Sequence, residues 1–401
     1  MSRPGGFLAR ALRALIAVAV RAIYAVPALL FVAAGKRLIR LTHPDRIGHL
    51  AAEVDCLLTE VALGLIPRRD LVLLAPDDAI ANRRLADYWG ERVEVVRSPA
   101  ACRLLAPMHR FKFARACEDI TRYAVAINDT PQFVAISRQW GERPPLLSIP
   151  EDDTARGQAA LRKLGIEPGA AFVCFHNREG GYFPEDEHLH SFRNASIENY
   201  LPAMRMLAAR GIHCVRLGDP SMQRLPAIAR VIDYAHSGLR ADWLDLFLCA
   251  NCTFFVGNTS GLFLVPFIFG VPCCLANLVP FSAAPAYGRP HDLGIPKLLW
   301  SEREGRLLSF PQILASPIGD FRFSELYSEH GVRPIENTPQ EIQDVVLEML
   351  ERVEGRAAYT PKDQALQETF RALLRPGHNA YGGASRVGRD FLRKYEHLLG
   401  D

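Results

Sequence analysis

The stretch Phe255–Phe263, FVGNTSGLF, decides the fold of this chain of 401 residues. It starts as an apolar strand and continues into a turn in which two glycines enclose three polar residues. Glycine allows close backbone approach, and Thr259 or Ser260 can cap a helix expected over residues 262–269. The backbone N–H groups at the start of such a helix attract an anion. The stretch therefore predicts a strand, a turn that holds a phosphate group and a short helix, with a purely structural turn as the alternative interpretation.

Further strands and helices alternate on both sides of this stretch. Apolar runs at 171–176, 212–217 and 271–277 predict strands, and the segments 196–210 and 242–249 predict helices. Strands separated by helices of this length are typical of a parallel sheet covered on both faces. We therefore expect an α/β protein whose second half is a Rossmann-like, doubly wound domain.

The first half carries a weaker form of the same pattern. An apolar helix is expected to end at Leu63, followed by a strand at 70–76, a helix at 81–89 and a strand at 93–96. These elements predict a second, smaller α/β domain, whose topology the pattern leaves open. Near the other end of the chain, Thr338–Glu341 has the pattern of a capping box that opens a helix. The expected domains are 1–42, 43–155, 156–358 and 359–401, the last made of helices.

The composition disfavours disorder and nucleic-acid binding. With 49% hydrophobic residues, the chain can form two packed cores. Seven of the 47 basic residues precede the first acidic residue, Asp45, and the other 40 stand against 44 acidic residues. No basic stripe with interleaved aromatics follows, so we expect no nucleic-acid partner. The nine cysteines are typical of buried thiols in a cytoplasmic protein, and the pair Cys249 and Cys252 lacks the further ligands of a zinc site.

The amino-terminal segment predicts an attachment to a membrane surface. Residues 7–41 are apolar and basic, and Arg3, Arg10, Arg13 and Arg21 fall within one arc of a helical wheel. The longest uncharged run, 22–35, contains a proline and is shorter than the roughly 20 residues of a spanning helix. A signal anchor, a cleaved signal peptide and a buried segment are the alternatives.

Polar residues follow three of the expected strands. Because parallel strands place their carboxyl ends at one edge of a sheet, these residues should face one crevice. Arg178 can clamp a diphosphate with its planar guanidinium, and it lies among glycines rather than in an apolar run. The phosphate-binding candidates are Arg193, Asn194, Arg216, Gly218, Gly257, Asn258, Thr259, Ser260 and Gly261. The alternative for the charged residues is a solvated surface loop.

Several of these runs together resemble a known group of proteins. The resemblance spans roughly residues 43–352 and rests on Arg46–His49, Arg193–Asn194 with Tyr200, Arg216–Met222, Val231–Ser237, Phe247–Gly261 with Gly270–Pro272, and Ile295–Trp300. The chain is similar there to bacterial glycosyltransferases from surface-carbohydrate loci that have the two-domain GT-B architecture. In addition, His176 and Arg178 look like the His-x-Arg element of fucosyltransferases of this architecture, whose arginine contacts the donor diphosphate.

The resemblance implies transfer of a sugar from a nucleotide-sugar donor to a surface-polysaccharide or lipid-linked acceptor. Residues 43–155 would then be the acceptor-side domain and 156–358 the nucleotide-sugar domain. The leaving diphosphate must be neutralised, and the chain has no Asp-x-Asp element to hold a metal ion. We therefore expect a metal-independent reaction, without a cofactor besides the donor, in which Arg178, Arg216 and the helix start after Gly261 stabilise the leaving group.

An acceptor hydroxyl needs a general base, and four residues qualify by type: His176, Asp219, Glu187 and His49. The expected location is the cytoplasmic face of the inner membrane, with peripheral or amino-terminal attachment. A nucleotide-sugar epimerase of similar fold would bind the same donor without an acceptor. A non-catalytic partner in a polysaccharide assembly complex is the alternative from a different class.

Overall fold

The computed structural model describes residues 5–110, 115–123, 132–182, 184–284 and 289–400, and the side chains of all of these except 5–11, 13, 14, 17, 20–22 and 110. The chain divides into two compact units, Met1–Arg122 and Tyr123–Asp401. Each unit is described by itself. The four domain ranges expected from the sequence stay a prediction.

The first unit contains these helices and strands: α1 (Gly5–Ala33), β1 (Lys36–Arg40), α2 (Val54–Ala62), β2 (Asp70–Leu74), α3 (Arg83–Trp89), β3 (Glu94–Val96), α4 (Pro99–Leu105) and β4 (Cys117–Glu118). The second unit contains α5 (Gln132–Trp140), α6 (Glu151–Lys163), β5 (Phe172–His176), α7 (Glu187–His190), α8 (Leu201–Ala209), β6 (His213–Arg216), β7 (Val231–Ile232), α9 (Asp242–Asn251), β8 (Phe255–Gly257), α10 (Leu264–Ile268), β9 (Cys273–Leu278), β10 (Leu293–Pro296), β11 (Leu298–Ser301), β12 (Arg306–Leu307), α11 (Phe310–Leu314), α12 (Ser324–Glu329), β13 (Val332–Ile335), α13 (Pro339–Val353), α14 (Pro361–Leu373), β14 (Arg386–Val387) and α15 (Arg389–Lys394).

The sheet of the first unit has the strand order β3-β2-β1-β4, and all its pairs are parallel. The inner strand β1 shows that one expectation was wrong. The basic and apolar segment 7–41 was expected to be helical throughout, but its last residues form this strand. Helix α1 ends at Ala33, and Gly35 adopts a φ of +79°, which suits a helix stop. The next apolar pair, Leu38 and Ile39, is fully buried in the sheet.

The second half of α1 belongs to the core of this unit. Ala28 is buried among residues of β1, β2 and α4, and Tyr24 and Phe31 pack partly against the same cluster. The opposite side of the helix is apolar and exposed. Among the residues that the structure describes, no helix is both long enough and apolar enough to cross a membrane.

The large sheet of the second unit has the strand order β14-β10-β9-β8-β5-β6-β7, and its pairs are parallel. From β5 the chain builds outward through β6 to β7, and it then returns to build the other side through β8, β9 and β10. The strand order therefore reverses between β5 and β8. Ligands of such sheets bind at the carboxyl ends of the strands at this reversal.

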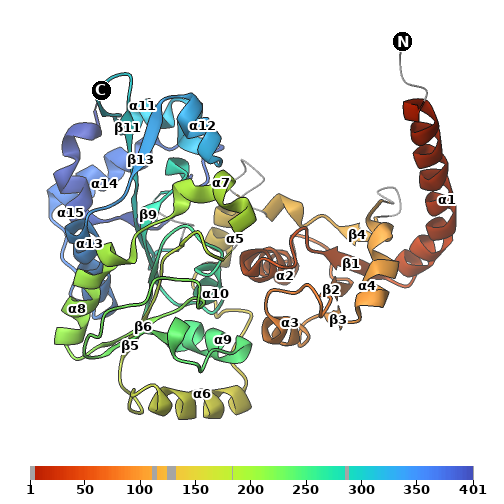
Figure 1. Cartoon of the computed structure of the whole chain (residues 1–401), viewed down its shortest axis with the longest axis horizontal. Coiled ribbons are helices and arrows are strands. Elements are labelled where there is room, and N and C mark those ends of the chain that lie inside the picture. Colours follow the sequence, from red (N-terminus) through yellow and green to blue (C-terminus); the bar gives the residue numbers. More distant parts are fainter. Residues whose placement is uncertain (1–4, 111–114, 124–131, 183, 285–288, 401) are drawn as a thin grey trace. The chain divides into compact units, whose positions relative to one another are not determined.

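Helices cover both faces of the large sheet (Figure 1). Three buried thiols mark the two faces: Cys174 of β5 donates to a carbonyl of α9, whereas Cys214 of β6 and Cys274 of β9 donate to carbonyls of α8 and α13. Burial raises the pKa of each of these thiols. The α/β class and the doubly wound parallel sheet expected from the sequence are confirmed, as is the amino-terminal helix.

The end of the chain adds to the second unit. The capping box predicted at Thr338 is present at the start of α13, with the Thr338 and Glu341 side chains bonded to each other's backbone N–H. The segment 359–401 contains the expected helices and also strand β14, which pairs with β10. A small antiparallel sheet of order β12-β11-β13 was not expected from the sequence.

Candidate functional site

The carboxyl ends of β5 and β8 lie side by side at the reversal of the strand order. His176 pairs with Gly257 in the parallel register. A Cβ atom at Gly257 would lie 2.8 Å from the carbonyl oxygen of His176 and 2.6 Å from the Phe255 ring. Only glycine can lie this close to the neighbouring strand, so Gly257 is needed for the packing of β8 against β5.

Arg178 follows β5 and lies at the centre of a small charged cluster. Its Nη1 donates to the side-chain oxygen of Asn194 and to Oε2 of Glu187, 3.2 Å away. The Asn194 amide in turn donates to Glu187. The structure therefore brings Arg178 and Asn194 together, as the sequence predicted, and adds Glu187 as their counter-charge. An anionic ligand at this place would compete with the Glu187 carboxylate for the Arg178 guanidinium.

Asn258 links this cluster to the loop before α8. Its side-chain oxygen accepts from the backbone N–H of Arg178 at 3.0 Å, and its amide donates to the carbonyl of Arg193 at 2.9 Å. The residue is fully buried. Because both ends of its side chain are in use inside the protein, Asn258 positions the two arginines, which differs from the phosphate contact expected for it.

The turn after β8 ends in a buried hydroxyl. Thr259 Oγ1 accepts from the backbone N–H of Val279 at 3.1 Å, whereas Ser260 Oγ is buried and has no hydrogen-bond partner within the described part of the chain. Neither residue caps α10, which has five residues and Phe263 at its N-cap, so the expected cap is wrong. Such a hydroxyl loses hydrogen bonds to water on burial, and a phosphate oxygen in the crevice would restore one.

Arg216 lies at the end of β6 but inside the protein. Its side chain is fully buried, with Nη2 donating to the carbonyl of Gln223 and lying 3.0 Å from Oδ1 of Asp233. Asp233 also accepts from the ring of His236 at 2.9 Å. This ion pair orders the segment between β6 and β7, and the burial argues against the phosphate contact expected of Arg216.

The turn after β6 is shaped by Gly218 and Asp219. Gly218 has a φ of +150°, and a Cβ atom there would lie 2.2 Å from the sulfur of Met222. Asp219 accepts from the backbone N–H of Ser221 at 2.8 Å and is half-buried. Gly218 therefore fixes the path of the backbone, and the Asp219 carboxylate remains open to solvent beside it.

His176 is buried and uncharged at neutral pH. Its Nδ1–H donates to the carbonyl of Leu217 at 3.3 Å. Burial, together with the charges of Arg216 and Arg178, lowers the pKa of His176 to about 4, against the opposing effect of that hydrogen bond. A group with so low a pKa is a weak general base at neutral pH.

Of the fourteen candidates, His49 alone belongs to the first unit. It opens a π-helical turn, His49–Glu53, and its Nδ1 contacts the carboxylate of the buried Glu53. The remaining candidates lie in the second unit. Arg193 is half-buried in the loop beside Asn194, and Gly261 is exposed at the end of the β8 turn.

Lys297 belongs to the site and was missed in the sequence. It follows β10, is only 4% exposed, and its Nζ donates to the carbonyls of Phe192 at 3.0 Å and Asn194 at 2.6 Å. Burial lowers the pKa of Lys297 to about 8, although the nearby Glu336 acts in the opposite direction. Two signals were available in the sequence: Lys297 directly follows the apolar run Leu293–Pro296, and it lies within Ile295–Trp300, one of the runs that carry the resemblance.

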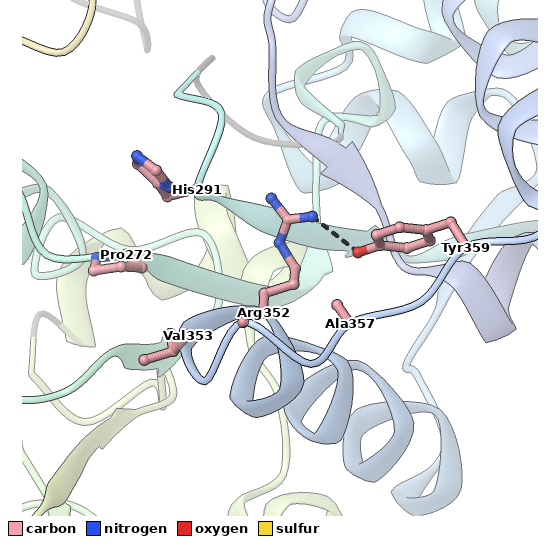
Figure 2. A pocket seen from close by; sticks show the side chains of 7 residues that line it. Pro272, His291, Arg352, Val353, Ala357 and Tyr359 are labelled. Atoms are coloured by element: carbon pink, nitrogen blue, oxygen red, sulfur yellow. Dashed lines mark hydrogen bonds between the residues drawn. The ribbon is translucent and has the colours of Figure 1, made fainter.

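Two cavities lie outside this cluster. One of about 600 Å³ is lined by Pro272, His291, Arg352, Val353, Gly355, Ala357 and Tyr359. Figure 2 shows the Arg352 guanidinium between His291 and Tyr359, with its 2.8 Å hydrogen bond to the Tyr359 hydroxyl. Because Pro272 and His291 precede β9 and β10, this cavity lies at the amino edge of the sheet, away from the strand ends discussed above. A second cavity, of about 360 Å³, borders Ser191 and Phe192.

Comparisons with known proteins complete the description. A scan against protein-family models and a search of curated proteins found no match. Among solved structures, the chain is similar to a glycosyl transferase family 9 protein of Veillonella parvula, with 12% identity and a TM-score of 0.41, covering 65% of this chain and 86% of that chain. It is similar to the ADP-heptose LPS heptosyltransferase II of E. coli with 13% identity and a TM-score of 0.32, covering 60% and 84%. It is also similar to a spinosyn forosaminyltransferase, with 10% identity and a TM-score of 0.30, covering 91% of this chain and 99% of that chain. Every TM-score is below 0.5, and we base no inference on these likenesses.

Proposed function

We propose that the chain is a metal-independent glycosyltransferase that moves a sugar from a nucleotide-sugar donor to a surface-polysaccharide or lipid-linked acceptor. One observation carries the proposal. Arg178 and Ser260 follow two adjacent strands at the reversal of strand order, where such sheets bind ligands, and the buried hydroxyl of Ser260 has no hydrogen-bond partner among the described residues. A positive guanidinium and an unsatisfied hydroxyl suit the oxygens of a diphosphate.

The reaction would break the bond between the anomeric carbon of the sugar and a phosphate oxygen, and the leaving nucleoside diphosphate would keep the electron pair. Arg178, Arg193, Asn194 and Ser260 would surround that leaving group and stabilise its charge. The acceptor oxygen would form the new bond and release its proton to a base. The half-buried Asp219 and Glu187 fit this role better than His176, whose pKa is low.

Binding of the donor can be tested by thermal unfolding of the full chain with nucleoside diphosphates and nucleotide sugars, in the presence of EDTA. A ligand at about 100 times its Kd adds roughly 2.7 kcal/mol of stability. We expect a shift with one nucleotide in the wild type and none in Arg178→Ala. The matched control is Arg333→Ala, which removes an exposed arginine paired with Glu302. Absence of a shift with every nucleotide in the wild type would refute the donor site.

Turnover then separates the remaining alternatives. A nucleotide-sugar epimerase would release a changed nucleotide sugar without any acceptor, whereas a binding partner would show the thermal shift without turnover. A glycosyltransferase would consume the donor in proportion to the glycosylated acceptor.

We propose further that the chain attaches to the cytoplasmic face of the inner membrane through α1. The support is an apolar outer face on this helix, where Leu12, Ile16, Ile23, Val26 and Leu30 are all exposed at helical spacing. An exposed row of this size on a water-facing helix suggests burial in a lipid interface.

Removal of residues 1–42 is a poor test of this attachment, because it would delete the central strand β1. The variant Leu12→Gln/Ile16→Gln/Ile23→Gln leaves the strand and the inner face of α1 in place. We expect it to lose sedimentation with vesicles that contain anionic lipid. The control is Leu65→Gln, another exposed leucine of the same unit. Equal sedimentation of both proteins would overturn the attachment.

A further inference from the structure

The loop Phe192–Ala195 has four consecutive backbone carbonyls, and each of them accepts a hydrogen bond from a buried side chain. Lys297 provides two of these contacts, because its Nζ donates to the carbonyls of Phe192 and Asn194 at 3.0 and 2.6 Å. An ammonium group has three N–H donors, so one residue can join two carbonyls.

Two asparagines provide the other contacts. The Asn258 amide donates to the carbonyl of Arg193 at 2.9 Å, and the Asn177 amide donates to the carbonyl of Ala195 at 2.7 Å. Lys297, Asn258 and Asn177 directly follow β10, β8 and β5 of the large sheet, and all are buried. The loop is therefore fastened to the carboxyl edge of the sheet at each of its residues.

This arrangement determines what the loop presents to a ligand. With its carbonyls bonded to residues at the carboxyl edge of the sheet, the loop has the Arg193 and Asn194 side chains left for other contacts, and Asn194 contacts Arg178. A buried ammonium group is costly, and a neutral side chain would fill this place at a lower cost in desolvation. A positive charge beneath an anion site offers a physical reason for the lysine.

We propose that Lys297 is a positioning residue of the donor site, which holds Arg193 and Asn194 in the geometry that binds the donor phosphates and adds its own charge beneath them. The proposal rests on the proposed function, because it requires that this crevice binds a diphosphate. Asn258 and Asn177 act in the same way through the carbonyls of Arg193 and Ala195.

The test measures the affinity of the full chain for ADP, GDP and UDP by calorimetry, in the wild type, in Lys297→Met and in Lys394→Met. Methionine keeps most of the length of the lysine side chain and removes its charge and donors. We expect an affinity loss of at least about tenfold in Lys297→Met, since hydrogen bonds from a charged group are lost. Lys394→Met is the matched control, because it removes an ammonium that bonds to Glu341 on the outer helices. Unchanged affinity in a folded Lys297→Met variant would overturn the inference.

A pH profile gives a readout that loss of packing alone would not change. Between about pH 7 and about pH 9 the wild type should lose affinity as Lys297 gives up its proton, and Lys297→Met should not. Glu336 is the charged side chain that acts on Lys297 from an adjoining segment, and carboxylates keep their charge in this range. The ligand's own titration affects both proteins equally, so an equal slope in the two would contradict the role of the charge.

If Lys297→Met does not fold, Asn177→Asp tests the same fastening, because it replaces the donor to Ala195 by a carboxylate that repels the carbonyl. We expect weaker nucleotide binding in this variant too, and unchanged binding would overturn the inference. If no nucleoside diphosphate binds to the wild type, the proposed function fails. If they bind to the wild type and to the variants alike, only the positioning role fails.

Discussion

The two parallel sheets of this protein differ at their carboxyl edges. In the first unit, Asp77 follows β2 and Arg97 follows β3, and the guanidinium donates to the Asp77 carboxylate at 2.6 and 2.9 Å. In the second unit, Ser260 and Asn177 each keep a buried polar oxygen that has no hydrogen-bond partner within the described chain. Polar residues that pair with one another at a strand end satisfy each other's hydrogen bonds, whereas an unpaired buried oxygen leaves a hydrogen bond open.

The largest expected effect concerns acid sensitivity, which should arise in the second unit at His176. Its folded pKa of about 4 lies below the ordinary value of 6.5, so the unfolded chain binds more protons between these pH values. Stability should therefore fall by up to about 3 kcal/mol as the pH drops from 6.5 to 4. The measurement is urea unfolding at both pH values in the wild type and in His176→Asn. An equal loss in the two proteins would place the acid sensitivity elsewhere.

The next effect separates binding from stability. Arg178→Ala should weaken nucleotide binding by about 2 kcal/mol, because it removes charge-assisted hydrogen bonds to the diphosphate. Its stability should change little, since the pair with Glu187 is partly exposed. Calorimetry with the nucleotide found in the thermal screen, combined with urea unfolding, measures both quantities. A large loss of stability with unchanged affinity would make Arg178 a structural residue and would contradict its place in the donor site.

Adjacent residues of the β8 turn should respond in opposite ways. Ser260→Ala removes an unpaired buried hydroxyl and should stabilise the free protein by up to about 1 kcal/mol while it weakens nucleotide binding. Thr259→Val removes the acceptor of the Val279 N–H and should destabilise the protein by about 1 kcal/mol. Thermal unfolding of the two variants, with and without nucleotide, tests this pair. If Ser260→Ala destabilises the free protein, the hydroxyl has a structural partner and the comparison of the two edges fails.

The smallest effect is expected in the first unit. Arg97→Ala should cost less than about 1 kcal/mol of stability, because its ion pairs with Asp77 and Asp87 are partly exposed. Nucleotide affinity should stay the same. A measurable loss of affinity in this variant would mean that the paired edge also takes part in donor binding.

The sequence was sufficient for most of the helices and strands, whereas the place of the donor site stays a prediction. Local patterns carry that information: the apolar run before Gly257 predicted β8, and the Thr338 capping box predicted α13. Two of the candidate residues, Arg178 and Asn194, do meet in the structure. The functional consequences expected at this edge stay predictions.

The roles of individual side chains could not be predicted in the same way. Asn258 and Arg216 were expected to contact phosphate, yet their partners come from Arg193 and Asp233, 65 and 17 residues away in the chain. Strand β1 was hidden because the apolar pair Leu38 and Ile39, flanked by basic residues, continues the apolar and basic composition of the preceding segment. The partner of a buried side chain depends on which distant segments pack against each other. Local sequence patterns do not show this packing.

The connection between α1 and β1 has a mechanical consequence. Only Ala34 and Gly35 separate the helix from the central strand of the first sheet, a tether that reaches at most about 7 Å. A surface that binds the outer face of α1 would therefore hold that sheet at a fixed distance from itself, because so short a connection does not let the sheet move independently of the helix.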